Sequence, residues 1–349
     1  GILGPQRADV DDVSINTLGP FKRVNNEFSV LDRADLVMID PVGPGFSRPV
    51  GDAKGEDCWG VDNDIESVSN FIARYISDNG RWASPKYLLG ESYGGIRSGG
   101  VAFELLSAHS IALNGVILVS PYMDFVGGNN GAVNDLADVN YLSTFAATAW
   151  YHSAIDDRPD SLTEFLAEAE AFAYGEYASV LLKGTRATAE ERASVLAGLE
   201  RFTGISADYW DRANLRINEA RFAKELLRDQ RKTVGRVDSR FVGDAINHIG
   251  EMFNYDPYMA AVGPAFIAAF NDYDREELGV KTDRPYVGSA GLYRDWDQRH
   301  QTPGMGKVAI ANTAVDLAYA MSQNPNMRLL VQQGYFDLAT PYGATQYFL

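Results

Sequence analysis

A serine near residue 90 has the local sequence that nucleophilic catalysis requires. Ser92 lies in the pattern Gly-x-Ser-x-Gly, after the apolar run 87–89 and before a segment with helical spacing of apolar residues. A strand, a sharp turn and a helix in this order lift a serine hydroxyl out of a sheet, and the flanking glycines leave room for the turn. Ser92 is therefore the candidate nucleophile.

An aspartate late in the chain is the candidate partner. A serine hydroxyl is a weak nucleophile at neutral pH and needs a base, normally a histidine that a carboxylate orients. Asp337 follows the apolar run 329–331, which places an acid at the carboxyl end of a late strand. Where such a triad follows the order serine, acid, histidine, Asp337 fits the second place. The simpler alternative is a turn aspartate before Thr-Pro.

No histidine follows Asp337 in this sequence. All four histidines precede it: His109, His152, His248 and His300. His300, in a polar run, is the best candidate for a base out of order, and the others are more simply residues of helix surfaces or caps. We favour the interpretation that the catalytic histidine has been cut off. A fragment of this kind should be nearly inactive.

Charge and composition exclude several classes of partner. The 349 residues carry a formal net charge of −16. Such a surface repels phosphate backbones and anionic membranes, so we expect neither a nucleic-acid nor a membrane partner.

Cys58 is the single cysteine. An internal disulfide and a cysteine-rich metal site are therefore excluded, and we expect no metal and no cofactor.

The elements that position these residues alternate between strand and helix. Four short apolar runs predict buried strands of a parallel sheet: residues 36–39, 87–89, 116–119 and 329–331. Helical patterns separate the first two runs and follow Ser92. This alternation through residue 127 predicts a doubly wound α/β sheet.

The middle of the chain has a different pattern. Helical spacing dominates three stretches, at residues 161–184, 188–198 and 218–231. A further helix is expected at 311–321, just before the last strand. We predict a mainly helical cap at residues 128–306, inserted into an α/β core formed by residues 1–127 and 307–349.

Three segments together resemble the serine carboxypeptidase family, in particular its bacterial branch. Gly-Glu-Ser-Tyr-Gly at residues 90–94 matches the nucleophile box of that family, and residues 40–47 are similar to another of its loops. Residues 334–337, followed by Pro341, resemble the segment with the triad aspartate. The resemblance implies an α/β-hydrolase fold and a peptide substrate with a free C-terminus, cleaved through an acyl-enzyme on Ser92.

The resemblance also implies roles for both neighbours of Ser92. Glu91 would belong to a carboxyl cluster that binds the C-terminal carboxylate of the substrate. Such an acid donates to an anion only while protonated, which fits an enzyme of acid pH; the alternative is an acid that stabilises a helix N-terminus. The Tyr93 N–H would be one oxyanion-hole donor. The second comes from a family segment upstream of a stretch resembling residues 1–5, so we expect truncation at both ends.

Other functions remain open at this point. An esterase or an acyltransferase with a cap would use the same triad, and a catalytically dead homologue would keep only a peptide-binding pocket. A dinucleotide-binding protein is disfavoured because no Gly-x-Gly-x-x-Gly opens the first βα unit. The resemblance points to a periplasmic or secreted location. The sequence predicts neither the residue preference nor the oligomeric state.

Overall fold

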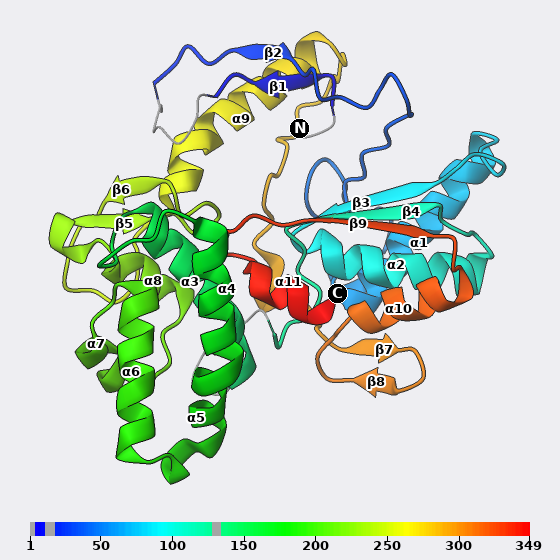
Figure 1. Cartoon of the computed structure of the whole chain (residues 1–349). Helices are drawn as coiled ribbons and strands as arrows, with labels where there is room; N and C mark the ends of the chain where they lie inside the picture. The colour runs from blue at the N-terminus through cyan, green and yellow to red at the C-terminus, as the bar shows by residue number, and fades with distance from the viewer. Residues whose placement is uncertain (1–3, 11–17, 128–133) are drawn as a thin grey trace. The chain divides into compact units, whose positions relative to one another are not determined.

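The chain forms two compact units in a computed structural model that describes residues 4–10, 18–127 and 134–349 (Figure 1). Unit 1 comprises residues 1–38, 142–284 and 336–339, and unit 2 comprises residues 39–141, 285–335 and 340–349. Residues 1–5 resemble a segment of the serine carboxypeptidases, but residues 1–3 lie outside the part of the chain that the structure describes. The division into a core and a cap at residues 128–306 stays a prediction.

Unit 2 contains a parallel sheet of three strands. The strands are β3 (Tyr87–Glu91), β4 (Gly115–Val119) and β9 (Arg328–Gln332), in the order β3–β4–β9. The register places Leu89, Ile117 and Leu330 in one row across the sheet. Three of the four predicted strands are therefore confirmed, and the carboxyl ends of all three lie at one edge of the sheet.

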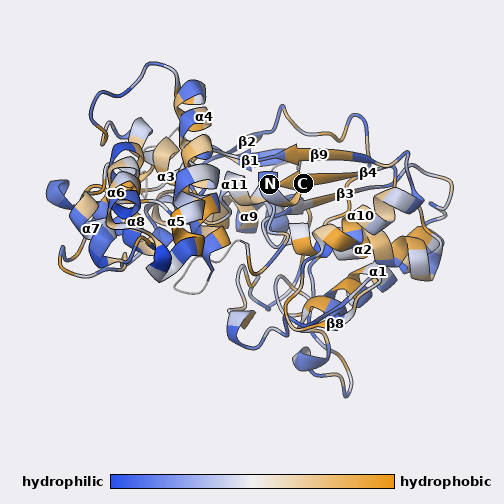
Figure 2. Ribbon diagram, turned by 60° about the horizontal axis from the view of Figure 1, so that its bottom comes forward, coloured by the Kyte–Doolittle hydropathy of each residue, from blue (hydrophilic) through white to orange (hydrophobic). Residues whose placement is uncertain are grey.

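Three helices cover one face of this sheet (Figure 1). They are α1 (Val61–Asp78), α2 (Gly94–His109) and α10 (Ala314–Gln323). A Cβ on Gly100 of α2 would lie 2.1 Å from Ile65 of α1, and a Cβ on Gly99 would lie 2.5 Å from the backbone oxygen of Thr313, which precedes α10. The two glycines thus allow close packing on both sides of α2. Figure 2 shows hydrophobic residues concentrated on the sheet and on these helices.

The prediction of a strand at residues 36–39 is wrong. No strand in the described part of the chain pairs with this segment, and Val37 and Met38 are 42% and 69% exposed. An apolar run forms a strand only where a neighbouring strand satisfies its N–H and C=O groups. Hydrophobicity alone could not show whether such a neighbour exists.

Residues 142–284 of unit 1 are mainly helical. The helices that include them are α3 (Asp135–Tyr151), α4 (Leu162–Phe172), α5 (Ala178–Lys183), α6 (Ala189–Thr203), α7 (Ala207–Arg212), α8 (Glu219–Glu225) and α9 (Pro257–Glu276). A π-helical turn at Ala173–Tyr177 joins α4 to α5, so the helical stretch predicted at 161–184 is nearly continuous. Thr188 and Glu191 form a reciprocal capping box at the start of α6. The helix predicted at 218–231 is shorter, because α8 ends at Glu225.

Short hairpins and a final helix complete the units. In unit 1, β1 (Gln6–Ala8) pairs with β2 (Arg23–Asn25), and β5 (Lys232–Val234) pairs with β6 (Val242–Asp244). In unit 2, β7 (His300–Thr302) pairs with β8 (Gly306–Val308), and α11 (Tyr342–Phe348) follows β9. None of the described helices has both the length and the apolar character needed to cross a membrane.

Candidate active site

Ser92 occupies the turn between β3 and α2. Its φ is +54°, a left-handed conformation that is strained for a residue with a Cβ. The Ser92 N–H donates to the carbonyl of Val119 at 3.1 Å, and the Ser92 carbonyl accepts from Gly95 at 2.9 Å and from Tyr122 at 2.8 Å. These three bonds tie the turn to the end of β4 and hold the exposed serine in the conformation that a nucleophile elbow requires.

The glycines of the motif are not equivalent. A Cβ on Gly90 would lie 2.1 Å from the carbonyl oxygen of Gly94 and 2.4 Å from the hydroxyl of Ser98. A Cβ on Gly95 would lie 2.8 Å from the carbonyl oxygen of Tyr122, whereas a Cβ on Gly94 would meet nothing within 4 Å. The expectation that both flanking glycines make room is therefore right for Gly90 and wrong for Gly94. The second close approach falls at Gly95, one residue beyond the motif.

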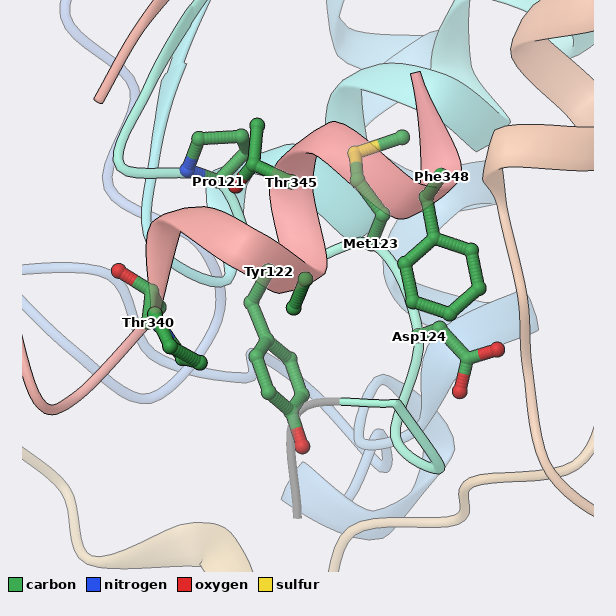
Figure 3. Close-up of a pocket in the computed structure, with 9 residues that line it drawn as sticks. Pro121, Tyr122, Met123, Asp124, Thr340, Thr345 and Phe348 are labelled. Atoms are coloured by element: carbon green, nitrogen blue, oxygen red, sulfur yellow. The ribbon is translucent and has the colours of Figure 1, made fainter. Parts of the chain in front are cut away.

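The loop after β4 supports this turn, and α11 packs against that loop. Figure 3 shows Phe348 of α11 beside Met123 and Asp124, on the segment that also carries Tyr122. These residues enclose a pocket of only about 10 Å³, room for about one water. Asp124 accepts hydrogen bonds from the N–H groups of Val126 and Gly127, and burial raises the pKa of its carboxyl group. Helix α11 is thus part of the support behind the serine.

Tyr93 is the N-cap residue of α2. The first N–H groups of a helix have no partner within the helix and carry its positive dipole end, which suits an oxyanion. The Tyr93 ring meets Trp296 edge-to-face at 5.3 Å, and the Trp296 indole N–H donates to the phenol oxygen at 3.1 Å. Burial first, and then the charge of Asp64, raise the pKa of Tyr93, so the phenol stays neutral.

Glu91, the expected ligand for the substrate carboxylate, is the last residue of β3. Its side chain is exposed at the strand end next to Ser92. Within the described residues no hydrogen bond or ion pair joins it to another carboxyl group, so the carboxyl cluster implied by the family resemblance stays a prediction.

An ion pair with a buried carboxylate lies beside Tyr93. Asp64 of α1, 2% exposed, accepts two hydrogen bonds from the Arg97 guanidinium of α2, at 2.8 Å and 3.0 Å. Burial raises the pKa of Asp64, and Arg97 partly counteracts that rise. The guanidinium also stacks on the Tyr93 ring at 5.4 Å. Sequence reasoning missed this pair, although Asp64 falls on the buried face of α1 with Val61 and Ile65, where an unpaired acid is rare.

The loop at residues 40–47 folds around its first residue. The Asp40 carboxylate accepts from the N–H of Phe46 at 2.9 Å, and the Asp40 carbonyl accepts from the Ser47 hydroxyl at 2.7 Å. Gly45 has φ +60°, and a Cβ there would lie 2.0 Å from the Asp40 carboxyl carbon. The spacing of the acid and the glycine in this loop therefore has a packing reason.

A cleft of about 510 Å³ has Tyr93 in its lining. It is lined by residues 288–293 and, among others, by Pro41, Val42, Pro44, Tyr93, Phe125 and Trp296. Tyr93 directly follows Ser92 in the chain, so one residue of the cleft lining belongs to the turn that carries the serine.

His300 is not available as a base for Ser92. The side chain is 4% exposed; its Nδ1 lies 2.7 Å from an Asp62 oxygen, and its Nε2 lies 3.0 Å from both oxygens of Asp316. Ionised carboxylates only accept, so two such partners favour the imidazolium form of the ring, in which both nitrogens donate. Burial alone would lower the pKa of His300, but Asp316 and Asp62 outweigh it and raise that pKa. A cation with both N–H groups engaged cannot accept a proton.

The other three histidines form no described hydrogen bond with Ser92. His109 is the last residue of α2, roughly 22 Å along the helix from its first residue. The Nε2 of His152 in unit 1 lies 2.7 Å from the carbonyl oxygen of Ser239, and burial lowers the pKa of His152. His248 lies in unit 1, in the loop after β6. None of the described hydrogen bonds joins a histidine to Ser92.

Asp337 belongs to unit 1, whereas Ser92 belongs to unit 2. The aspartate is 8% exposed, and one of its carboxylate oxygens accepts from the N–H of Ala339 at 2.8 Å. The preceding carbonyl, of Phe336, accepts from the N–H of Ser239 at 2.9 Å. The turn role of Asp337 is therefore observed, and its catalytic role stays a prediction.

A serine in a strained strand-to-helix turn on a parallel sheet is the arrangement found in α/β-hydrolases. The family model of the serine carboxypeptidases matches residues 11–261, more than half of the chain. The chain therefore belongs to the serine carboxypeptidase family, which has the α/β-hydrolase fold. The matched stretch includes Ser92 and the loop at 40–47 and ends before Asp337. None of the curated proteins compared with this sequence matches it.

Proposed function

We propose that this protein is a serine-type carboxypeptidase that removes C-terminal residues from peptides through an acyl-enzyme on Ser92. The observation that carries the proposal is the left-handed Ser92 at the turn between β3 and α2. Family membership supports the choice of a peptide substrate. Peptides with free C-termini are then the partners, and neither nucleic acid nor a membrane is needed.

In the proposed reaction the Ser92 hydroxyl attacks the carbonyl carbon of the last peptide bond. Its proton passes to a histidine base and then to the departing amine, while the Tyr93 N–H stabilises the oxyanion. Water next cleaves the acyl-enzyme by the same proton transfers in reverse. Asp337 would orient the histidine, and the exposed Glu91 would bind the C-terminal carboxylate of the substrate. The helical stretch in residues 128–306 would act as a cap.

Neither His300 nor His109 serves as the base in this proposal. His300 is held as a cation between two carboxylates, and His109 lies at the far end of α2. A histidine that follows Asp337 in the order serine, acid, histidine would complete the triad.

The test uses one peptide in two forms, with a free and with an amidated C-terminus. The chain is incubated with each form while imidazole is added as a small-molecule base, and mass spectrometry follows the release of the last residue. We expect release from the free acid only, and none from the Ser92→Ala protein. Equal release from both forms, or release that persists in Ser92→Ala, would contradict carboxypeptidase action at Ser92.

A further inference from the structure

We propose that Asp64 and Arg97 are positioning residues for the reaction at Ser92, because together they fix Tyr93, the residue whose backbone N–H is the proposed oxyanion donor. This inference rests on the proposed function, since it uses Ser92 as the reacting group. The pair joins the first turns of α1 and α2. In this account both side chains act only through Tyr93, which directly follows Ser92 and caps α2.

Tyr93 is held at its backbone, at its ring face and at its hydroxyl. The Arg97 N–H donates to the Tyr93 carbonyl at 3.1 Å, and the Arg97 guanidinium lies over the Tyr93 ring, 5.4 Å from its centroid. A cation over a ring face is attracted by the π electrons of the ring. The Trp296 indole N–H donates to the phenol oxygen at 3.1 Å. Arg97 therefore supplies two of the three attachments that fix this residue.

Asp64 in turn fixes the Arg97 side chain. An arginine side chain has many rotamers, and ordering it costs conformational entropy. The Nε and Nη2 groups of Arg97 donate to the two Asp64 oxygens at 2.8 Å and 3.0 Å, a bidentate arrangement that sets the plane of the guanidinium. Asp64 is 2% exposed, and its own N–H donates to the Gly60 carbonyl at 2.9 Å. The guanidinium is thus held over Tyr93 by an acid that is itself fixed on α1.

Charge alone does not account for this pair. After burial, the negative charge of Asp64 is the main cause that raises the pKa of Tyr93, so its field reaches the proposed oxyanion donor. A negative charge at this place opposes an oxyanion, whereas the positive charge of Arg97 favours one. The two effects counteract each other in an ion pair. A role in holding Tyr93 in position explains why both charges are present.

The test measures how fast a fluorophosphonate labels Ser92 while imidazole supplies the base. The serine oxygen bonds to phosphorus, fluoride leaves, and imidazole takes the hydroxyl proton. Rates at several reagent concentrations give the maximal rate and the reagent affinity separately. Asp64→Asn should lower the maximal rate roughly 10- to 100-fold and leave the affinity unchanged, because the oxyanion donor is displaced. By charge alone, the same change would raise the rate.

Two further variants separate position from charge and from stability. Arg97→Lys keeps the cation but loses the bidentate contact, so it should lower the maximal rate as Asp64→Asn does. Asp64→Leu combined with Arg97→Met replaces the ion pair by apolar side chains of similar volume, a change that often leaves stability unchanged or raises it. Urea unfolding of this double variant should resemble that of the wild type, while its labelling should be as slow as in the single variants.

The matched control is Asp78→Asn, the same substitution on the same helix. Asp78 forms an ion pair with Arg74, in which both side chains are exposed. Exposed pairs contribute little to stability, and this one contacts neither Tyr93 nor Arg97 in the described structure. Labelling and unfolding should both stay at the wild-type values.

Three results would overturn the inference: a wild-type or higher rate in Asp64→Asn, a wild-type rate in the double variant, or a loss that lies only in the reagent affinity. The unchanged protein distinguishes this failure from that of the proposed function. If it is labelled at Ser92 and the variants match it, the positioning role alone is wrong. If it is not labelled at Ser92 even with imidazole, the nucleophile is wrong and the positioning role falls with it.

Discussion

At Ser92 the backbone is held at φ +54° although the residue has a Cβ. The strained conformation persists because the carbonyls of Val119 and Ser92 and the N–H groups around them fix the turn from several sides. Strain of this kind is concentrated at functional sites, where it costs stability and serves position. We infer that the strained backbone of Ser92 serves to present the serine hydroxyl to a substrate.

The first prediction follows from that strain. Ser92→Gly should raise the free energy of unfolding by about 1 kcal/mol, because glycine adopts the left-handed region without a steric cost. Ser110, exposed with φ +55° at the C-cap of α2, is the matched control. Urea unfolding should show a similar gain for Ser110→Gly, while only Ser92→Gly removes reactivity. A loss of stability in Ser92→Gly would contradict the strained turn.

His300 gives the second prediction, which concerns pH. Asp316 and Asp62 raise its pKa against the effect of burial, so its contribution to stability is complete below the ordinary pKa and is lost as pH rises through the higher folded value. At about pH 6 the His300→Gln protein should be less stable than the wild type by about 3 kcal/mol.

Urea unfolding of the two proteins at about pH 6 and about pH 9 checks this prediction. The difference in unfolding free energy should narrow at the higher pH, because the stabilisation from the raised pKa of His300 declines as pH rises above the ordinary pKa of histidine. A difference that is the same at both values would mean that His300 acts by packing and not as a cation between two carboxylates.

At the scale of elements, the junction of β3 and α2 depends on close approach at one glycine of the motif and not at the other. Gly90→Ala should cost about 3 kcal/mol, since a methyl group there would displace the first turn of α2. Gly94→Ala, with open space around the new Cβ, should be neutral or slightly stabilising. Thermal unfolding of both variants compares them directly, and equal losses would contradict the geometry.

Much of the α/β element pattern could be predicted, because apolar runs and helical spacing are local signals. Strands β3, β4 and β9 and helices α1, α2 and α6 lie where those signals place them. The conformation of residues 36–39 could not be predicted from their hydrophobicity, because a strand forms only beside a neighbouring strand and hydrophobicity does not show whether one is present.

The site itself was predictable only in part. Ser92 lies in a motif in which Gly90 must be small, because a side chain there would collide with α2. The sequence therefore identifies Ser92 directly. Two contacts of the site join segments far apart in the chain: the ion pair of Asp64 with Arg97, and the ring contact of Tyr93 with Trp296. Contacts of that kind depend on tertiary packing, and no local pattern encodes them.

At the scale of the whole molecule, the candidate site residues are divided between the two units of the chain. Ser92, Tyr93 and the cleft belong to unit 2, and Asp337 belongs to unit 1. Triad members act together, so the removal of any one of them should abolish nearly all of the rate even with the other two groups in place. The nucleophile can still be tested alone, if a small molecule supplies the base.

The most direct measurement is therefore covalent labelling of Ser92 by a fluorophosphonate, with and without added imidazole, located by peptide mass spectrometry. The account predicts one adduct, on the peptide that contains Ser92, formed faster with imidazole and absent from the Ser92→Ala protein. Labelling spread over other serines at equal rates, or no adduct on Ser92 even with imidazole, would contradict the assignment of Ser92 as the nucleophile.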